Sequence, residues 1–133
     1  MDIGILRRDG RTDPFFDGTA ADRLVVKRCE PCDRWFAPDQ SGCPGCGGED
    51  LAWAEASGAA TLVTWTITHG RPAADGTAPP PAALALVELD EGPWLHARLD
   101  GTGPGDLREG LPLRACFEHP DEGESYILFR PAD

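Results

Sequence analysis

The residues with the clearest chemistry are four cysteines arranged as two Cys-x-x-Cys pairs: Cys29, Cys32, Cys43 and Cys46. A pair at this spacing can turn both thiolates toward one ion, and two such turns supply the four sulfur ligands of a tetrahedral zinc site. The residue after each pair often needs a left-handed backbone conformation. Gly47 meets this need without steric cost, and Asp33 is among the better-tolerated alternatives. The spacing therefore predicts a metal site with four cysteine ligands.

Two other uses of these cysteines compete with this one. A thioredoxin-like redox pair needs one Cys-x-x-Cys at the start of a helix within a βαβ pattern, and neither pair has that setting. A rubredoxin-type iron site uses the same four sulfurs, so iron stays an alternative; we favour Zn²⁺ because no electron-transfer partner is evident. Catalytic zinc keeps an open coordination position, whereas four thiolates close the shell. We therefore expect a structural ion that folds a segment without a core of its own.

The other reactive side chains do not form a catalytic set in the sequence. Cys116 falls on the polar phase of a predicted strand, and we interpret it as a structural free thiol. The carboxylates at 90–91 and 121–124 lie in turns, with no second group placed to tune their pKa values. None of the three histidines adjoins a serine or cysteine in a nucleophile motif: His69, His96 and His119. We therefore predict no catalytic residue.

Of these histidines, only His69 has a binding role as an alternative. His69 ends a predicted strand and lies close to Arg71, so it is either an ordinary strand-end residue or a contact for an anionic ligand at the mouth of a barrel. His96 shares a strand face with Arg98, and we expect that face to be solvated.

The charge of the chain argues against nucleic-acid binding. The formal net charge is −11, from 12 basic and 23 acidic residues. Counting along residues 35–133 gives five basic and sixteen acidic residues, the reverse of the basic stripe that offsets phosphate charge. No apolar run approaches the roughly 20 residues that a membrane span needs, and residues 1–8 do not resemble a signal peptide. We expect a cytoplasmic protein without a membrane partner.

The segment before the cysteines predicts a short helix. Asp13 followed by Pro14 is a plausible helix start, with the aspartate as the cap. Gly18 weakens the helix. Residues 24–26 then read as a brief strand, and 28–56 is expected to be a knuckled loop structure because it has no helical period. The predicted helix has one apolar edge: Phe15, Phe16, Ala20 and Leu24.

The remainder of the chain predicts an all-β unit. Along 61–69, Val63, Trp65 and Ile67 alternate with threonines, which is the period of a half-buried strand. Residues 82–89 are almost continuously apolar and fit a central strand, and further strands are predicted at 94–99, 111–117 and 126–129. Five short strands favour a small barrel. The connection 70–81 is expected to be an exposed, mobile loop.

These patterns together resemble a known family. The matching stretches extend over 14–131. They are PFFDG, RLVVKRCEPCDRWFAP, CPGCGGEDLAWAEASGAATLVTWTITH, ALALVELDEGPWLHARL, LREGLPLRACFE and the closing YILFRP. They are similar to the acyl-CoA-associated OB-fold proteins, which join a rubredoxin-like zinc ribbon to an OB-fold barrel. Asp33 departs from the glycine that the family commonly has there. The expected fold is mainly β, with a helical segment and lead-in strand at 1–27, a zinc ribbon at 28–56 and a five-stranded OB-fold barrel at 57–133.

The resemblance also implies a function. Members of that family are typically non-catalytic partners of thiolase-like acyl-CoA enzymes, thiolases or aldolases, and help to hold the acyl-CoA. We therefore expect an accessory subunit in a hetero-oligomer, with His69 and Arg71 as candidate acyl-CoA contacts. Aromatic residues in short segments either form the partner interface or cover the ribbon and the open end of the barrel. They are Phe15, Phe16, Trp35 and Phe36.

Two alternative functions stay open. One is a stand-alone acyl-CoA or acyl-carrier binding protein, or a weak thioesterase. The other is a module that binds single-stranded nucleic acid, a use to which OB folds are often put. The acidic barrel segment argues against the second alternative.

Overall fold

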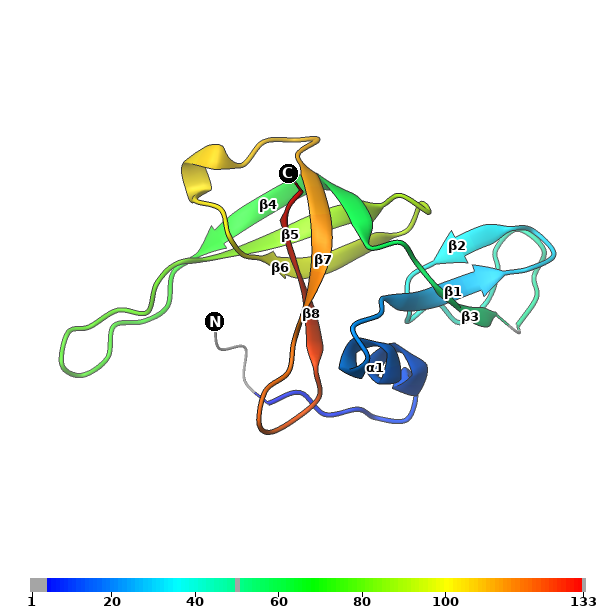
Figure 1. Ribbon diagram of the computed structural model, residues 1–133, viewed down its shortest axis with the longest axis horizontal. Coiled ribbons are helices and arrows are strands. Elements are labelled where there is room, and N and C mark those ends of the chain that lie inside the picture. Colours follow the sequence, from blue (N-terminus) through cyan, green and yellow to red (C-terminus); the bar gives the residue numbers. More distant parts are fainter. Residues whose placement is uncertain (1–4, 50, 133) are drawn as a thin grey trace.

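The protein consists of a short helix, a small sheet and a barrel, described by a computed structural model for residues 5–49 and 51–132 (Figure 1). The helix α1 spans Asp13–Ala20. A three-stranded antiparallel sheet in the order β2-β1-β3 follows, and then a closed barrel in the order β4-β5-β6-β8-β7. The expected mainly-β fold with a five-stranded barrel is confirmed. No helix among the described residues is long and apolar enough to cross a membrane.

The strands of the small sheet are β1 (Val25–Cys29), β2 (Arg34–Phe36) and β3 (Ala52–Glu55). Those of the barrel are β4 (Ala59–Thr68), β5 (Ala82–Leu89), β6 (Trp94–Leu99), β7 (Pro112–Glu118) and β8 (Tyr126–Pro131). A single 3₁₀ turn, Pro104–Asp106, lies between β6 and β7. The limits 1–27, 28–56 and 57–133 stay predictions.

Helix α1 begins and ends differently from the prediction. Thr12, and not Asp13, occupies the N-cap position, and its carbonyl accepts the backbone N–H of Phe15 at 3.0 Å. Leu24 was predicted to continue the apolar edge of the helix, but the helix ends at Ala20 and Leu24 is buried beyond the following turn. That turn is closed by backbone bonds to the carbonyl of Gly18.

The ribbon segment has more regular structure than its sequence indicated. A knuckled loop was expected, yet β2 and β3 both pair with β1, through Arg28 with Trp35 and Lys27 with Trp53. Strands of three and four residues are too short to show a clear period, so the pairing depends on β1 as a template.

A β-bulge in β4 corrects the predicted strand phase. The register passes from Leu62 opposite Val87 to Thr64 opposite Leu86, which leaves Val63 without a partner on β5. The extra residue lets Leu62 and Trp65 both face the core although they are three positions apart. Val63 therefore does not continue the inward row of Trp65 and Ile67 as predicted.

The barrel closes around a core of aliphatic side chains and one phenylalanine. Phe129 is fully buried, and it pairs with Leu99 in the parallel ladder between β6 and β8. The antiparallel pairing of β4 with β7 joins the two ends of the sheet and closes the barrel. Closure leaves the barrel with two surfaces, an interior that is filled and an exterior that is free to vary.

Two connections bear on the site. The segment between β4 and β5 projects far from the barrel (Figure 1), and residues 69–81 are exposed throughout. The β7–β8 loop instead holds α1 against the barrel: Thr19 Oγ1 donates to the carbonyl of Ser125 at 2.9 Å, and Arg8 pairs with Glu124 at 2.8 Å. His119 bridges the same loop to the end of the helix, through Ser125 Oγ and Asp22 Oδ1, each at 2.7 Å.

Candidate functional site

The four cysteines come together at one end of the three-stranded sheet. Their sulfur atoms all lie within 4.8 Å of one another, and the Sγ atoms of Cys29 and Cys46 are 3.6 Å apart. A tetrahedral ion with metal–sulfur bonds of about 2.3 Å places its ligands about 3.8 Å apart, so this cluster has the size of such a site. Cys29 and Cys43 are buried, whereas Cys46 lies at the surface.

Each Cys-x-x-Cys turn has the predicted backbone geometry. Asp33 has a φ of 53° and Gly47 a φ of 74°, both in the left-handed region. The aspartate is held there by hydrogen bonds from the guanidinium of Arg28, one of them 3.0 Å long. The second turn is closed by a bond of 2.7 Å from the N–H of Gly47 to the carbonyl of Cys43.

The surroundings of the sulfurs shift their pKa values in opposite directions. The backbone N–H of Cys46 lowers the pKa of the Cys43 thiol to about 7. A hydrogen bond between the side chains of Cys32 and Cys46, together with burial, raises the pKa of the Cys32 thiol to about 12. Four thiolates so close together repel one another, and a divalent cation between them removes that repulsion. The residues present therefore fit a structural metal ion with a closed shell.

The predicted aromatic residues divide between two places. Phe15 and Phe16 lie on α1, with their rings edge to face at a centroid distance of 5.3 Å. Trp35 and Phe36 lie on β2, and each is covered by an arginine about 5.8 Å from its ring. All four are half-buried, and Phe15 and Trp35 pack against the hydrophobic core.

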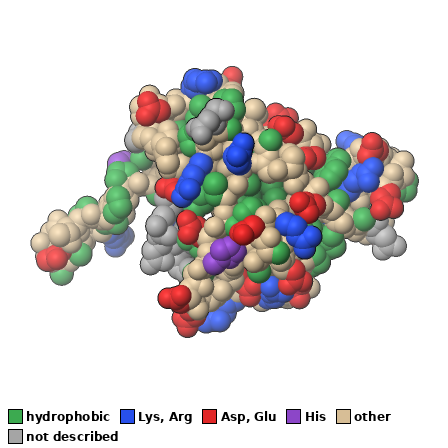
Figure 2. Space-filling model, viewed as in Figure 1, with side chains coloured by type: hydrophobic (Ala, Val, Ile, Leu, Met, Phe, Trp, Pro, Cys, Tyr) green, Lys and Arg blue, Asp and Glu red, His purple; other side chains and the backbone are tan. Residues whose placement is uncertain are grey.

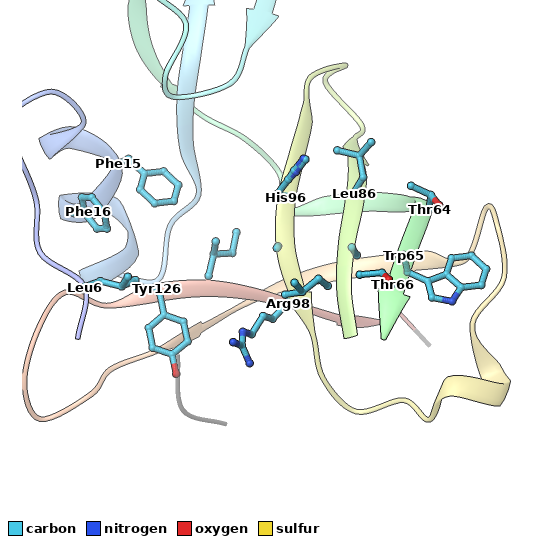
Figure 3. A pocket seen from close by; sticks show the side chains of 14 residues that line it. Leu6, Phe15, Phe16, Thr64, Trp65, Thr66, Leu86, His96, Arg98 and Tyr126 are labelled. Carbon is cyan, nitrogen blue, oxygen red and sulfur yellow. The ribbon is translucent and has the colours of Figure 1, made fainter. Parts of the chain in front are cut away.

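A groove runs between α1 and the outside of the barrel. It has a volume of about 610 Å³, and Figure 3 shows Phe15, Phe16 and Leu6 on one side of it, facing the strands of the barrel. The strand side carries two rows of neighbouring residues in register, and all six line the groove. The rows are Thr64, Leu86 and His96, and Thr66, Leu84 and Arg98.

The groove continues toward the ribbon. A second hollow of about 450 Å³ shares Phe15, Leu86 and His96 with the first and adds Trp94 and Pro38. We call the two hollows together the α1–barrel groove. Its walls combine residues of the helix, the barrel and the loop that follows β2, so neither the barrel nor the three-stranded sheet forms the groove alone.

The candidate contacts His69 and Arg71 lie elsewhere. Both are exposed in the projecting β4–β5 connection, and neither lines the α1–barrel groove. Three residues that do line it, Leu84, Leu86 and Trp94, were not predicted as site residues. The signal of the two leucines was present in residues 82–89, whose apolar character on both strand faces we interpreted as burial in a central strand. His96 and Arg98 do share one face, as predicted, but that face belongs to the groove.

The charged surface is mixed. On the face shown in Figure 2, acidic and basic side chains lie interspersed over the barrel and the ribbon, with apolar side chains between them. Several of the basic residues are neutralised by acidic neighbours, as in the pairs Arg130–Asp100 and Arg23–Glu55.

Comparison with known proteins places both parts of the chain in one family. Residues 16–52 match the family described as "ChsH2, rubredoxin-like zinc ribbon domain", and residues 53–118 match "ChsH2, C-terminal OB-fold domain". The solved structure of the "Ltp2-ChsH2(DUF35) aldolase" contains a chain that superposes with a TM-score of 0.81 at 29% identity, over 95% of this chain and 98% of that one. A DUF35-family protein from Sulfolobus solfataricus, at 19% identity and a TM-score of 0.62, shares the fold.

Relatives with longer chains carry functional names. A "Probable enoyl-CoA hydratase alpha subunit" of Thermomonospora curvata is 31% identical over 118 residues, which are 89% of this chain and 36% of that protein. A "DUF35 domain-containing scaffold protein" of Pyrococcus furiosus is 36% identical over 91 residues, or 68% of this chain and 65% of that one. The chain thus spans about a third of the length of the Thermomonospora relative and just under two thirds of the length of the Pyrococcus relative.

Proposed function

Because the chain belongs to the family that joins a ChsH2-type rubredoxin-like zinc ribbon to a C-terminal OB-fold, we propose that it is a non-catalytic accessory subunit of an acyl-CoA-processing enzyme. The observation that carries the proposal is the similarity to the chain in the Ltp2-ChsH2(DUF35) aldolase structure, which extends over nearly the full length of both chains. The Pyrococcus relative named as a scaffold protein supports the same role. The name of the Thermomonospora relative supports an acyl-CoA substrate.

The partner that fits best is a thiolase-like enzyme, a thiolase or an aldolase, and the similarity to a chain of an aldolase favours it. We propose that the partner docks on the half-buried aromatic residues of α1 and β2, namely Phe15, Phe16, Trp35 and Phe36. Aromatic side chains that keep part of their surface exposed are enriched at interfaces because they bury a large area at little entropic cost. His69 and Arg71 are proposed to contact the anionic part of the acyl-CoA.

The metal is proposed to be a structural Zn²⁺ held by Cys29, Cys32, Cys43 and Cys46. Bound there, the ion would cross-link β1 to the loops on either side of β2 and so set the position of Trp35 and Phe36. The cysteines must be reduced to bind it, which is consistent with a cytoplasmic location. The ion has a supporting role, since a closed thiolate shell offers no position for a substrate.

Co-purification tests the function directly. A gently tagged chain is isolated from its native lysate, and the bound proteins are identified by mass spectrometry. We expect an acyl-CoA enzyme of the thiolase type in stoichiometric amount. A monodisperse chain that retains no such enzyme contradicts the proposal.

Matched variants locate the interface. Phe16→Ala and Phe36→Ala each remove one of the proposed aromatic contacts. Ile5→Ala is the control: it removes an apolar side chain that is 52% exposed and lies outside α1 and β2. We expect the first two variants to retain several-fold less enzyme and Ile5→Ala to retain the wild-type amount. If all three variants retain the same amount of enzyme, the interface lies elsewhere.

A further inference from the structure

We propose that the α1–barrel groove binds the acyl chain of the acyl-CoA, with Arg98 facing the polar end of that chain. This inference rests on the proposed function and deepens it, because it names the surface on which the accessory subunit receives part of the substrate. The groove does not include His69 or Arg71. Phe15 and Phe16, proposed above as partner contacts, form one of its walls, so the acyl chain would lie beside the partner interface.

The first argument is the placement of apolar side chains on the outside of the barrel. Along β5, Ala85 and Val87 face the core, while Leu84 and Leu86 point outward into the groove. Outward positions of an antiparallel strand are ordinarily polar where they meet water. Among the described residues the large apolar side chains that are most exposed are Ile5, Leu84 and Trp94, and the last two line the groove, at 39% and 52% exposure. This surface is therefore suited to an apolar ligand.

The second argument is charge. The chain has 23 acidic residues against 12 basic ones, yet none of the residues that line the larger hollow is acidic. The ionisable groups there are Arg98, His96 and Tyr126. Arginines elsewhere, such as Arg8 and Arg130, pair with carboxylates, whereas Arg98 has no ion pair with a carboxylate among the described residues. A guanidinium without a carboxylate partner beside an apolar surface can donate hydrogen bonds to the carbonyl oxygen of the thioester at the polar end of an acyl chain.

The third argument is shape. A hollow of about 610 Å³ lies within the range of small-molecule sites, roughly 300–1,000 Å³. It is lined by apolar side chains on both walls, and it continues past His96 and Leu86 toward Trp94. An acyl chain needs such a continuous apolar path, whereas a compact nucleotide needs several converging polar groups. Among the parts of an acyl-CoA, the acyl chain fits the groove best.

Calorimetry with a chain-length series tests the inference on the intact, zinc-loaded protein. The titrants are CoA and its butyryl, octanoyl, dodecanoyl and palmitoyl thioesters, each below the concentration at which it forms micelles. Burial of one methylene is worth about fourfold in affinity at most. We expect binding to tighten about two- to fourfold per methylene until the groove is filled. The same affinity for CoA and palmitoyl-CoA, or no binding by any of them, overturns the inference.

Two variants with matched controls assign the binding to this groove. Leu84→Gln is expected to weaken palmitoyl-CoA binding at least tenfold and to flatten its dependence on chain length; Glu88→Gln, on the same strand but outside the groove, leaves both unchanged. Arg98→Gln is expected to weaken every acyl-CoA about fivefold without changing the slope, whereas Arg108→Gln in an exposed loop has no effect. Circular dichroism melts establish that each variant is folded. A folded Leu84→Gln variant that binds like wild type overturns the inference.

Co-purification of the Leu84→Gln variant separates this inference from the proposed function. Retention of the enzyme together with loss of acyl-chain binding supports both. Loss of the enzyme, with no chain-length dependence in the wild type, shows that the groove is a protein interface and overturns the inference alone. Chain-length-dependent binding by a wild-type chain that captures no enzyme overturns the accessory role and leaves a stand-alone acyl-CoA binding site.

Discussion

Replacement of Gly18 by alanine is expected to destabilise the protein, although helix propensity alone predicts the opposite. Alanine inside a helix is about 1 kcal/mol more favourable than glycine, and Gly18 does not have the positive φ that would penalise a side chain. However, a Cβ atom at this position would lie 2.6 Å from Cγ2 of Val25 and 2.9 Å from the carbonyl oxygen of Arg23.

The size of the effect follows from these contacts. Carbon atoms attract one another best at about 3.5–4.0 Å, so relief of the contact with Val25 requires a shift of about 1 Å. Val25 is β-branched and paired with Glu55, and the carbonyl of Arg23 belongs to the backbone, so neither can move freely. Overpacking of this kind costs about 1–3 kcal/mol. After the gain in helix propensity of about 1 kcal/mol, we expect a net loss of up to about 2 kcal/mol.

Thermal unfolding of the metal-loaded chain measures this loss, which corresponds to a decrease in Tm of up to about 8 °C for a domain of this size. Gly105→Ala is the control, because a Cβ there meets nothing within 4 Å. In a double-mutant cycle, Val25→Ala should recover part of the loss caused by Gly18→Ala, since it removes Cγ2. If Gly18→Ala instead raises the Tm by the amount that propensity predicts, the close packing of α1 on β1 is refuted.

Three further predictions concern the metal, the core and the ion pairs. Removal of the ion with a chelator, or Cys43→Ser, should abolish the near-ultraviolet circular dichroism signal of the ribbon tryptophans, while the barrel still unfolds cooperatively. If the cooperative unfolding of the barrel is lost as well, the metal does not have a local role. Phe129→Ala should lower the free energy of unfolding by about 3–5 kcal/mol in urea, because the ring is fully buried, and a loss below 1 kcal/mol contradicts this packing. The hydrogen bond from Arg130 holds the pKa of Asp100 below its ordinary value of 3.8, so the stabilisation is present above that pH and is lost as the pH falls through the lowered pKa. The Tm difference between wild type and Arg130→Gln should therefore be small but measurable at pH 6, and it should shrink as the pH is lowered below 3.8; a difference that does not shrink has another cause.

The sequence predicted those features that depend on short-range spacing. Two Cys-x-x-Cys turns specify a metal site within a few residues each, and the conformations of Asp33 and Gly47 agree with that prediction. Alternation along single strands predicted the barrel. The same local reasoning placed Val63 in the inward row, because a bulge changes the strand phase without altering the residue types around it. It also extended the helical edge to Leu24, since periodicity does not record where a helix stops.

What the sequence determined by itself is therefore the chemistry of the metal site and the kind of fold, since both follow from residues that are neighbours along the chain. Only the tertiary structure decided where α1 packs, and with it the groove. The walls of that groove come from Phe15 and Leu84, which are far apart in sequence, and the helix reaches its position because Gly18 lets it approach Val25 closely. An apolar outward row on β5 looks like a buried strand until the barrel closes and shows which face is inside. For that reason the sequence could not distinguish the groove from the interior of the barrel.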